Sequence, residues 1–245
     1  MKIIKYKKKK NDIYEITLEN LRTIELYEDV ILKYNLLLSK EIELDNKEIF
    51  DFNIECEIYY KALKFLKLRA RSKKEVKDKL IKDNYDIKII IKIVKKLEKQ
   101  GYINDLLFSK SFLNNKLITT NNGPYKIRKD LHDKGISDDI INEVMNEYVD
   151  DIQQEKIKKI INTMLKSNRN KGNNVLKNKI SYHLITQGFD KKIIEDLISN
   201  TIFPDDSMIA KKEYDKLYNK FSSKYSGYEL EMKIKQKMFQ KGFKI

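Results

Sequence analysis

A short phrase that recurs four times along the chain constrains its fold more than any other feature. The copies are LIKDNYDIKII, LHDKGISDDII, LITQGFDKKII and MFQKGFKI, and they begin at Leu80, Leu131, Leu184 and Met238. Four residues after that apolar residue comes an Asn or a Gly, and one residue later a second apolar side chain. This spacing is typical of a helix that ends on a residue with positive φ, a conformation that Gly and Asn adopt most easily. Each copy therefore predicts the end of a helix.

The same phrase also predicts the start of the next helix. The turn residues of the four copies are Asn84, Gly135, Gly188 and Gly242. After three of them comes a short side chain whose oxygen can accept hydrogen bonds from the first N–H groups of a new helix, namely Asp86, Ser137 and Asp190. Ser72 and Glu75, ahead of the first copy, have the spacing of a capping box. We interpret each phrase as a helix–turn–helix junction.

The spacing of the turn residues indicates an internal repeat. They lie at positions 84, 135, 188 and 242, so the intervals by subtraction are 51, 53 and 54 residues. One further helical segment precedes each junction, such as IYYKALKFLKLRA or EKIKKIINTMLKS. Three short helices cannot bury their apolar faces alone, so neighbouring repeats should pack side by side. We predict three-helix repeats at residues 55–101, 102–149 and 150–201, and a truncated fourth repeat of two helices at 202–245.

The residues before the first repeat predict a different kind of element. Tyr14, Ile16 and Leu18 alternate with polar residues, which is the period of a strand with one buried face. KIIKYK and RTIELYE suit neighbouring strands, EDVILKYN suits a short helix, and the run of lysines at 7–10 suits the exposed edge of a hairpin. We expect a mainly α protein, with tandem three-helix repeats in an elongated, curved, solenoid-like array and a small β-containing N-terminal element at residues 1–54.

Composition excludes several classes of protein. The single cysteine, Cys56, excludes an intramolecular disulfide and a cysteine-based zinc site, and we expect it to be a buried thiol. No apolar run approaches the roughly 20 residues that span a bilayer. The lysine-rich N-terminus lacks the apolar segment of a signal peptide. We therefore expect a cytoplasmic protein that makes no membrane contact.

No set of residues in the chain predicts catalysis. The two histidines, His132 and His183, occupy different registers of two repeats and do not have a metal-ligand spacing. The sequence has seven glycines and contains neither a phosphate-binding loop nor a dinucleotide fingerprint. Paired carboxylates stand near expected helix starts, where the helix dipole favours negative charge. We expect a protein that is not an enzyme and that uses no cofactor and no metal.

The charge of the chain predicts a polyanionic partner. A net charge of +14 and an isoelectric point near 9.4 suit nucleic acid, although AT-rich codons would also enrich a sequence in lysine. The residues that we expect to bind nucleic acid or a protein partner gather around the junctions: Arg69, Arg71, Lys73, Lys74, Lys77, Lys126, Arg128, Lys129 and Arg169. The alternative interpretation of these residues is an ordinary solvated face.

Three segments resemble the RecX family of regulatory proteins, which modulate the bacterial recombinase RecA. They are ALKFLKLRARSKKEVKDKL from Ala62, GYINDLLFSKSFL from Gly101 and GPYKIRKDLHDKGIS from Gly123. In the family's order and spacing they contain an Arg-x-Arg-Ser motif, a turn with Gly followed by Asn/Asp-Asp, and a Leu-x-x-Lys-Gly-Ile run. Ser109 departs from the alanine that the family has there. The resemblance covers roughly residues 55–200 and implies tandem three-helix units.

The resemblance also implies a function. The chain would be a non-enzymatic regulator that binds the RecA–DNA filament and inhibits its assembly, ATP hydrolysis and strand exchange, in homologous recombination, DNA repair and the SOS response. Its partners would be the RecA filament and single- or double-stranded DNA, and we expect the chain itself to be a monomer.

Two other functions are compatible with the residues. One is a helix-turn-helix-like DNA-binding regulator, although the isoleucine-rich helix that follows Asp86 offers few side chains that could distinguish bases. The other is a helical-repeat scaffold for a different protein. Sequence preference at fixed salt would identify the first, and capture of a protein partner in the absence of a recombinase would identify the second.

Overall fold

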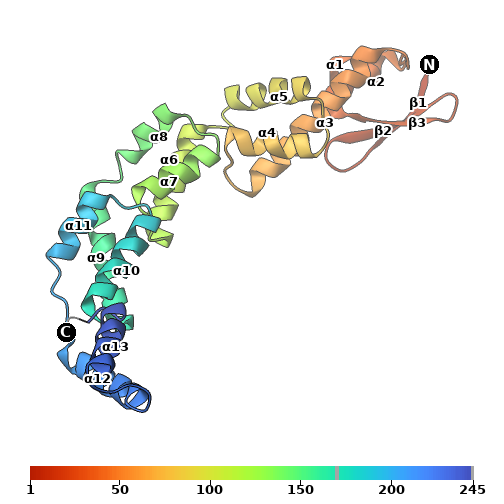
Figure 1. The fold of residues 1–245 in the computed structure, drawn as a ribbon. Coiled ribbons are helices and arrows are strands. Elements are labelled where there is room, and N and C mark those ends of the chain that lie inside the picture. Colours follow the sequence, from red (N-terminus) through yellow and green to blue (C-terminus); the bar gives the residue numbers. More distant parts are fainter. Residues whose placement is uncertain (169–170, 244–245) are drawn as a thin grey trace. The chain divides into compact units, whose positions relative to one another are not determined.

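The structure is a computed structural model that describes residues 1–168 and 171–243, and it consists of a small sheet followed by many helices (Figure 1). Backbone contacts divide the chain into two compact units. The first comprises Met1–Phe108 together with Lys134–Ile136, and the second comprises Ser109–Asp133 and Ser137–Ile245. The prediction of a mainly helical protein with a small β-containing N-terminal element is confirmed.

The N-terminal element is built on a three-stranded antiparallel sheet. Its strands, in the order β1-β2-β3, are Ile3–Lys8, Ile13–Leu18 and Thr23–Tyr27. Ile16 and Leu18 are fully buried, as the alternation of strand β2 predicted. They share a core with residues of two short helices, α1 (Glu28–Lys33) and α2 (Leu36–Ser39). The lysines at the end of β1 lie on an edge strand, which confirms their predicted place.

One long helix, α3 (Lys47–Leu68), belongs both to this element and to the first repeat. Its N-terminal half contributes Ile49 and Cys56 to the core beside the sheet, and its C-terminal half contributes Ile58 and Ala62 to the core of the repeat. The sequence of α3 contains no Gly or Pro to interrupt it. The helix therefore runs unbroken through residue 54, the position where the N-terminal element was predicted to end.

The first repeat is completed by α4 (Lys73–Lys82) and α5 (Ile87–Lys99), which pack against the second half of α3 (Figure 1). Val76 and Leu80 of α4 are buried against Ile90 and Leu97 of α5 in one apolar cluster. Leu80 begins the first copy of the recurring phrase and Ile90 ends it, so the two helices that meet at this junction share one core.

The helices that follow repeat this plan. They are α6 (Asp105–Thr119), α7 (Pro124–Asp133), α8 (Asp138–Met145), α9 (Asp150–Ser167), α10 (Asn173–Thr186), α11 (Lys191–Ser199), α12 (Ser207–Phe221) and α13 (Gly227–Gln240). In the second unit α9, α10 and α11 form a bundle around Ile157, Ile180 and Ile194, which are all fully buried. The helices α12 and α13 pair around Leu217 and Ile234.

All four turn residues adopt the positive φ that the junction phrase predicts. The angles are 63° at Asn84, 76° at Gly135, 84° at Gly188 and 89° at Gly242. The side chains of Asp86 and Asp190 accept hydrogen bonds from the N-termini of α5 and α11, which confirms those two caps. Ser137 precedes α8 as predicted, but its side chain makes no capping hydrogen bond in the described structure. Two aspartates in the first turn of α8 supply the negative charge there instead.

Candidate nucleic-acid and partner interface

The first cluster of predicted basic residues surrounds the start of α4, where Ser72 caps the helix. The Ser72 hydroxyl accepts a hydrogen bond from the Glu75 N–H at 3.2 Å, and the Glu75 carboxylate accepts one from the Ser72 N–H at 3.2 Å. The predicted capping box is therefore confirmed. Ser72 itself is fully buried, which a cap on an exposed helix end would not require.

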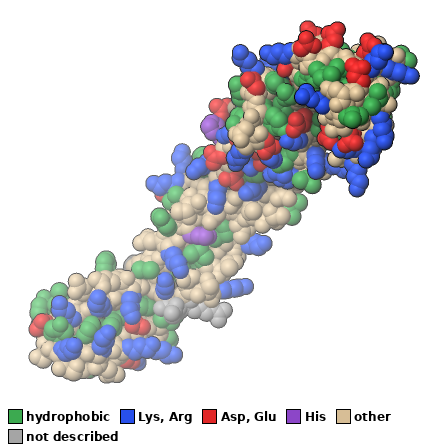
Figure 2. Space-filling view, turned by 90° about the vertical axis from the view of Figure 1, so that its right-hand side faces the viewer, with side chains coloured by type: hydrophobic (Ala, Val, Ile, Leu, Met, Phe, Trp, Pro, Cys, Tyr) green, Lys and Arg blue, Asp and Glu red, His purple; other side chains and the backbone are tan. Residues whose placement is uncertain are grey.

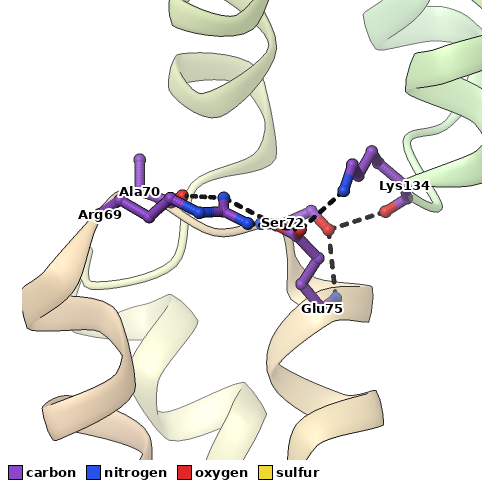
Figure 3. A network of polar contacts seen from close by, with 5 residues as sticks. All are labelled: Arg69, Ala70, Ser72, Glu75 and Lys134. Carbon is purple, nitrogen blue, oxygen red and sulfur yellow. Dashed lines mark hydrogen bonds and ion pairs between the residues drawn. The ribbon is translucent and has the colours of Figure 1, made fainter.

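Ser72 is buried because a turn from later in the chain packs against it (Figure 3). Its hydroxyl donates a hydrogen bond to the Lys134 carbonyl oxygen at 2.8 Å, and Lys134 lies in the segment of residues 134–136 that belongs to the first unit. The next residue, Gly135, approaches α4 so closely that a Cβ atom there would lie 2.7 Å from Lys74 Cβ. Two features therefore favour glycine at position 135: its positive φ, and the close contact with Lys74, which leaves no room for a Cβ atom.

Glu75 is the centre of the charge network at this junction. Its carboxylate lies 3.0 Å from Arg69 Nη2 and 2.8 Å from Lys134 Nζ (Figure 3). Partial burial would raise the pKa of Glu75, but the hydrogen bonds from Arg69, Lys134 and the Ser72 N–H together lower it to about 2. Arg69, which we predicted to bind a partner, is therefore held by a carboxylate that stays ionised at neutral pH.

Arg71 is held differently from Arg69. Its guanidinium carbon lies 4.1 Å from the centre of the Phe65 ring, a cation–π contact that fixes the side chain. Its Nε is buried and has no hydrogen-bond partner among the described residues. Burial lowers the pKa of Arg71, and the charge of Arg69 lowers it further. Arg71 is thus a positioned cation that makes no ion pair in the described structure.

The remaining basic residues of this cluster lie on α4. Lys73 Nζ lies 2.8 Å from the Glu98 carboxylate, so its charge is balanced within the first unit. Lys74 is exposed, and its stem carries the contact with Gly135. Lys77, half-buried, takes part in no ion pair in the part of the chain that the structure describes. Within this cluster, Arg69 and Lys73 are therefore held by acidic side chains, and Arg71 is held by an aromatic ring.

The predicted basic residues of the second unit lie on α7. Lys126 Nζ contacts Gln187 Oε1 at 3.2 Å, Arg128 Nη1 donates to Asn142 Oδ1 at 2.7 Å, and Lys129 is exposed. None of the three makes an ion pair with a described carboxylate, so their charges remain available to a partner. Arg169 lies outside the described residues. Figure 2 shows lysine and arginine side chains spread over the face that it presents, with acidic side chains among them.

In the second unit, too, the start of one helix is hydrogen-bonded to a turn from later in the chain, as Ser72 is to Lys134. No local sequence pattern predicts this contact. The Gly123 N–H donates to the Gln187 carbonyl oxygen at 2.7 Å, and the Tyr125 N–H donates to the Gly188 carbonyl oxygen at 3.0 Å. The first turn of α7 is thereby bonded to the last turn of α10. A Cβ atom at Gly123 would lie 2.3 Å from the Gly188 oxygen, so this position requires glycine.

The next pair of repeats uses the same arrangement. The Gly172 N–H donates to the Lys241 carbonyl oxygen at 3.2 Å, and the Asn174 N–H donates to the Gly242 carbonyl oxygen at 3.3 Å, which joins the start of α10 to the end of α13. Helix N-termini have N–H groups without partners and helix C-termini have carbonyls without partners, so each end satisfies the other. These contacts are structural joints between repeats.

The contacts at the starts of α4, α7 and α10 are thus three joints of one kind. An acidic side chain completes two of them. The Lys73 N–H donates to Asp105 Oδ1 at 2.8 Å, and the Asn173 N–H, in the equivalent place, donates to Asp206 Oδ2 at 2.8 Å. Burial raises the pKa of Asp105, and the hydrogen bond from Lys73 opposes this effect. In the joint of α7 the corresponding residue is Pro124, which has no N–H to satisfy. Asp105 belongs to the Asn-Asp turn of the segment GYINDLLFSKSFL, so this turn of the family pattern is part of a joint.

The other candidate groups are dispersed. Cys56 is buried, as expected, and burial raises the pKa of its thiol to about 11. His132 is exposed on α7 and His183 is half-buried on α10. Within residues 1–168 and 171–243, no three His, Cys, Asp or Glu side chains are grouped so that they could hold a metal ion. No helix in the same residues is long and apolar enough to cross a membrane.

Comparisons with known proteins agree with the repeats and with the motif segments. Residues 59–102 match a family model described as the first three-helix domain of RecX, and residues 104–145 match one described as the second three-helix domain. A solved structure titled as the regulatory protein RecX superposes with a TM-score of 0.70 and 26% identity, over 82% of this chain and 99% of that chain. RecX from Lactobacillus salivarius superposes with a TM-score of 0.56 and 30% identity, over 59% and 94%.

Two relatives match almost the whole chain. The regulatory protein RecX of Streptococcus sanguinis is 31% identical over 251 residues, which cover 99% of this chain and 95% of the relative. That of Listeria innocua is 30% identical over 245 residues, which cover 98% and 91%. Identity at this level over nearly the full length, together with the two matched three-helix domains, shows that the chain belongs to the RecX family of regulatory proteins.

Proposed function

We propose that this chain binds the RecA–DNA filament and inhibits its assembly, ATP hydrolysis and strand exchange. The observation that carries the proposal is membership of a family of regulatory proteins over nearly the full length of the chain. The positioned cation Arg71 and the lysines Lys74 and Lys77 of α4 support binding to an anionic partner. The α7 cations, which form no ion pair with a described carboxylate, support it as well.

The basic residues contribute unequally to the proposed interface. Arg69 and Lys73 are held by Glu75 and Glu98, so they stabilise the junction and add little to the attraction of a partner. Lys74 is exposed and Lys77 half-buried on α4, and replacing both by Gln tests how much the charge of this helix contributes to binding. A Gln at position 74 keeps the Cβ, Cγ and Cδ atoms that pack on Gly135.

Hydrolysis of ATP by RecA on single-stranded DNA tests the proposal. Adding the purified chain should lower the rate, and the chain without RecA should hydrolyse no ATP. The Lys74→Gln/Lys77→Gln variant should require a several-fold higher concentration for the same inhibition, because phosphate and carboxylate contacts are lost. The matched control is Lys7→Gln/Lys10→Gln, which removes the same charge from exposed positions near the β1–β2 hairpin. A rate that saturating protein leaves unchanged, or raises, would refute inhibition.

A function as a DNA-binding regulator that recognises particular sequences has less support from the residues of α5. In α5, the helix that follows the first junction, every polar side chain is a lysine apart from Glu98. Lysine contacts phosphates without regard to sequence, and among base edges it suits only guanine, so a helix of lysines can distinguish few sequences. We therefore expect equal affinity for DNA duplexes of different sequence at fixed salt, and a preference of more than tenfold for one sequence would favour this second function.

A further inference from the structure

The exposed face of α5 carries a concentration of positive charge that the junction clusters do not explain. Its buried face consists of Ile90, Ile93, Val94 and Leu97. The opposite face carries only lysines among its charged residues, all exposed: Lys88, Lys92, Lys95, Lys96 and Lys99. At 3.6 residues per turn these five side chains fall within an arc of about 100°. We call this set the α5 lysine face.

Neither the repeat architecture nor codon usage accounts for this face. The equivalent third helix of the second repeat, α8, reads DDIINEVM and contains no lysine or arginine. The third helix of the third repeat, α11, reads KKIIEDLIS and carries two lysines and two acidic residues. A codon bias would add lysine to all three helices alike. Among the third helices of the three repeats, the charge is therefore specific to α5.

A groove beside the α5 lysine face adds aromatic surface to this charge. It is lined by residues of α1, α3 and α5 within the first unit and has a volume of about 390 Å³. Lys33 Nζ lies 3.7 Å from the centre of the Phe52 ring, and Lys96 Nζ lies 4.5 Å from the centre of the Tyr59 ring. Two aromatic rings in this groove thus lie next to lysines that are able to bind phosphate.

The two carboxylates in the groove do not cancel its positive character. Glu55 is engaged with Lys92 Nζ at 2.5 Å, and Asp29 accepts a hydrogen bond from the Tyr60 hydroxyl at 2.7 Å. Lys33 and Lys96 have aromatic contacts and form no ion pair in the described structure. The three lysines that line the groove outnumber its two carboxylates, which leaves a net formal charge of +1 there.

We propose that the α5 lysine face binds the backbone of a single-stranded nucleic acid and that the adjoining groove receives an unpaired base against Phe52 or Tyr59. From Lys88 to Lys99 the helix rises about 16 Å. A strand that keeps the stacked spacing of B-form DNA, roughly 3.4 Å per phosphate, places about five phosphates over this length. Stacking on an aromatic side chain requires a base that is free of its pairing partner, so the groove favours single strands over duplexes. This site is independent of the proposed action on RecA.

Binding of a fluorescent oligothymidylate to the chain alone, measured by anisotropy over a range of salt, tests the lysine face. The Lys88→Gln/Lys95→Gln/Lys99→Gln variant removes three lysines that take part in no described ion pair. Three lost phosphate contacts, at roughly 0.7 each, should reduce the slope of log K against log salt by about 2. If the lines for the variant and the unmodified chain converge near 1 M salt, this change is about a hundredfold loss of affinity at 0.1 M salt. The matched control is Lys212→Gln/Lys216→Gln/Lys220→Gln on the exposed surface of α12. Equal losses in the two variants would show diffuse attraction only and would overturn the proposal.

A tryptophan reporter tests the groove. The chain has no tryptophan, so Phe52→Trp introduces a single emission signal at the groove. The oligothymidylate should quench this emission, and a duplex of the same length should leave it unchanged. Tyr59→Leu should weaken single-strand binding at least about fivefold without changing the salt slope. Quenching by the duplex, or displacement of the oligonucleotide by polyglutamate at equal charge concentration, would overturn the choice of a single strand. Because RecA is absent, these outcomes do not depend on whether the chain inhibits RecA.

Discussion

Replacing Gly123 by alanine tests the joint between the second and third repeats. The new Cβ atom would lie 2.3 Å from the Gly188 carbonyl oxygen and 2.5 Å from the Phe189 nitrogen. Both are backbone atoms in a tight turn, so they cannot swing aside as the end of a flexible side chain would. The start of α7 must therefore move away from the end of α10.

The cost of this movement follows from the contacts at the joint. The hydrogen bond from the Gly123 N–H to Gln187, at 2.7 Å, and that from the Tyr125 N–H to Gly188, at 3.0 Å, would be weakened or lost. Each contributes about 1 kcal/mol to the free energy of unfolding. Overpacking adds about 1–3 kcal/mol, and the lower entropy of alanine in the unfolded chain offsets about 0.4–1 kcal/mol. We expect a net destabilisation of about 2–4 kcal/mol.

Urea unfolding followed by far-UV circular dichroism measures this loss. The control is Gly101→Ala, because Gly101 has a φ of 77° but no atom within 4 Å of its would-be Cβ. That variant carries backbone strain alone, about 1–2 kcal/mol. Gly123→Ala should also broaden the transition, since a weakened joint lets neighbouring repeats unfold separately. If Gly123→Ala is no less stable than Gly101→Ala, the joint does not hold the repeats together.

Three further changes test individual groups. The pKa of Glu75 is lowered to about 2, so its ionised form contributes about 1 kcal/mol to the free energy of unfolding above the unfolded pKa near 4.3. This contribution is lost as the pH falls towards 2. Glu75→Gln should therefore remove this part of the loss of stability in acid. Ser72→Ala should cost about 2 kcal/mol in urea unfolding, since it removes a cap and leaves the Lys134 carbonyl without its donor, whereas Ser72→Thr should retain most of the stability. Cys56, with a buried thiol of pKa about 11, should react with a disulfide reagent at pH 8 only when urea unfolds the chain, and rapid labelling of the native protein would contradict its burial.

Local patterns predicted the helices and their turns well because the physical causes are local. Positive φ at Gly188 and a cap at Asp190 depend on neighbours within a few residues, and both are visible in the sequence. The continuity of α3 was harder to predict, because its buried residues serve two cores in succession and the apolar period shows no break. A boundary between elements was therefore predicted inside a helix.

The joints between repeats could not be predicted in this way. Gly123 is required by an oxygen of Gly188, 65 positions later, and no local rule connects the two. Only the recurrence of a small residue at helix starts, Gly123 and Gly172, would have indicated a contact there. For the same reason the sequence grouped Arg69 with the partner-binding residues, whereas the structure places it on Glu75.

The joints depend on backbone hydrogen bonds, whereas the α5 lysine face depends on positive charge. Variants can therefore change stability without changing binding, or binding without changing stability. The joints of α7 and α10 consist mainly of hydrogen bonds between backbone groups at helix ends, whose dipoles attract one another without any net charge. Gly123→Ala removes no charge, so in conditions where it is folded the salt slope for oligonucleotide binding should equal that of the unmodified chain. Replacing exposed lysines of α5 leaves its buried isoleucines in place, so the urea midpoint should hardly change while the salt slope falls. A lysine variant of α5 that altered both the urea midpoint and the salt slope would show that these lysines also support the packing of the first repeat.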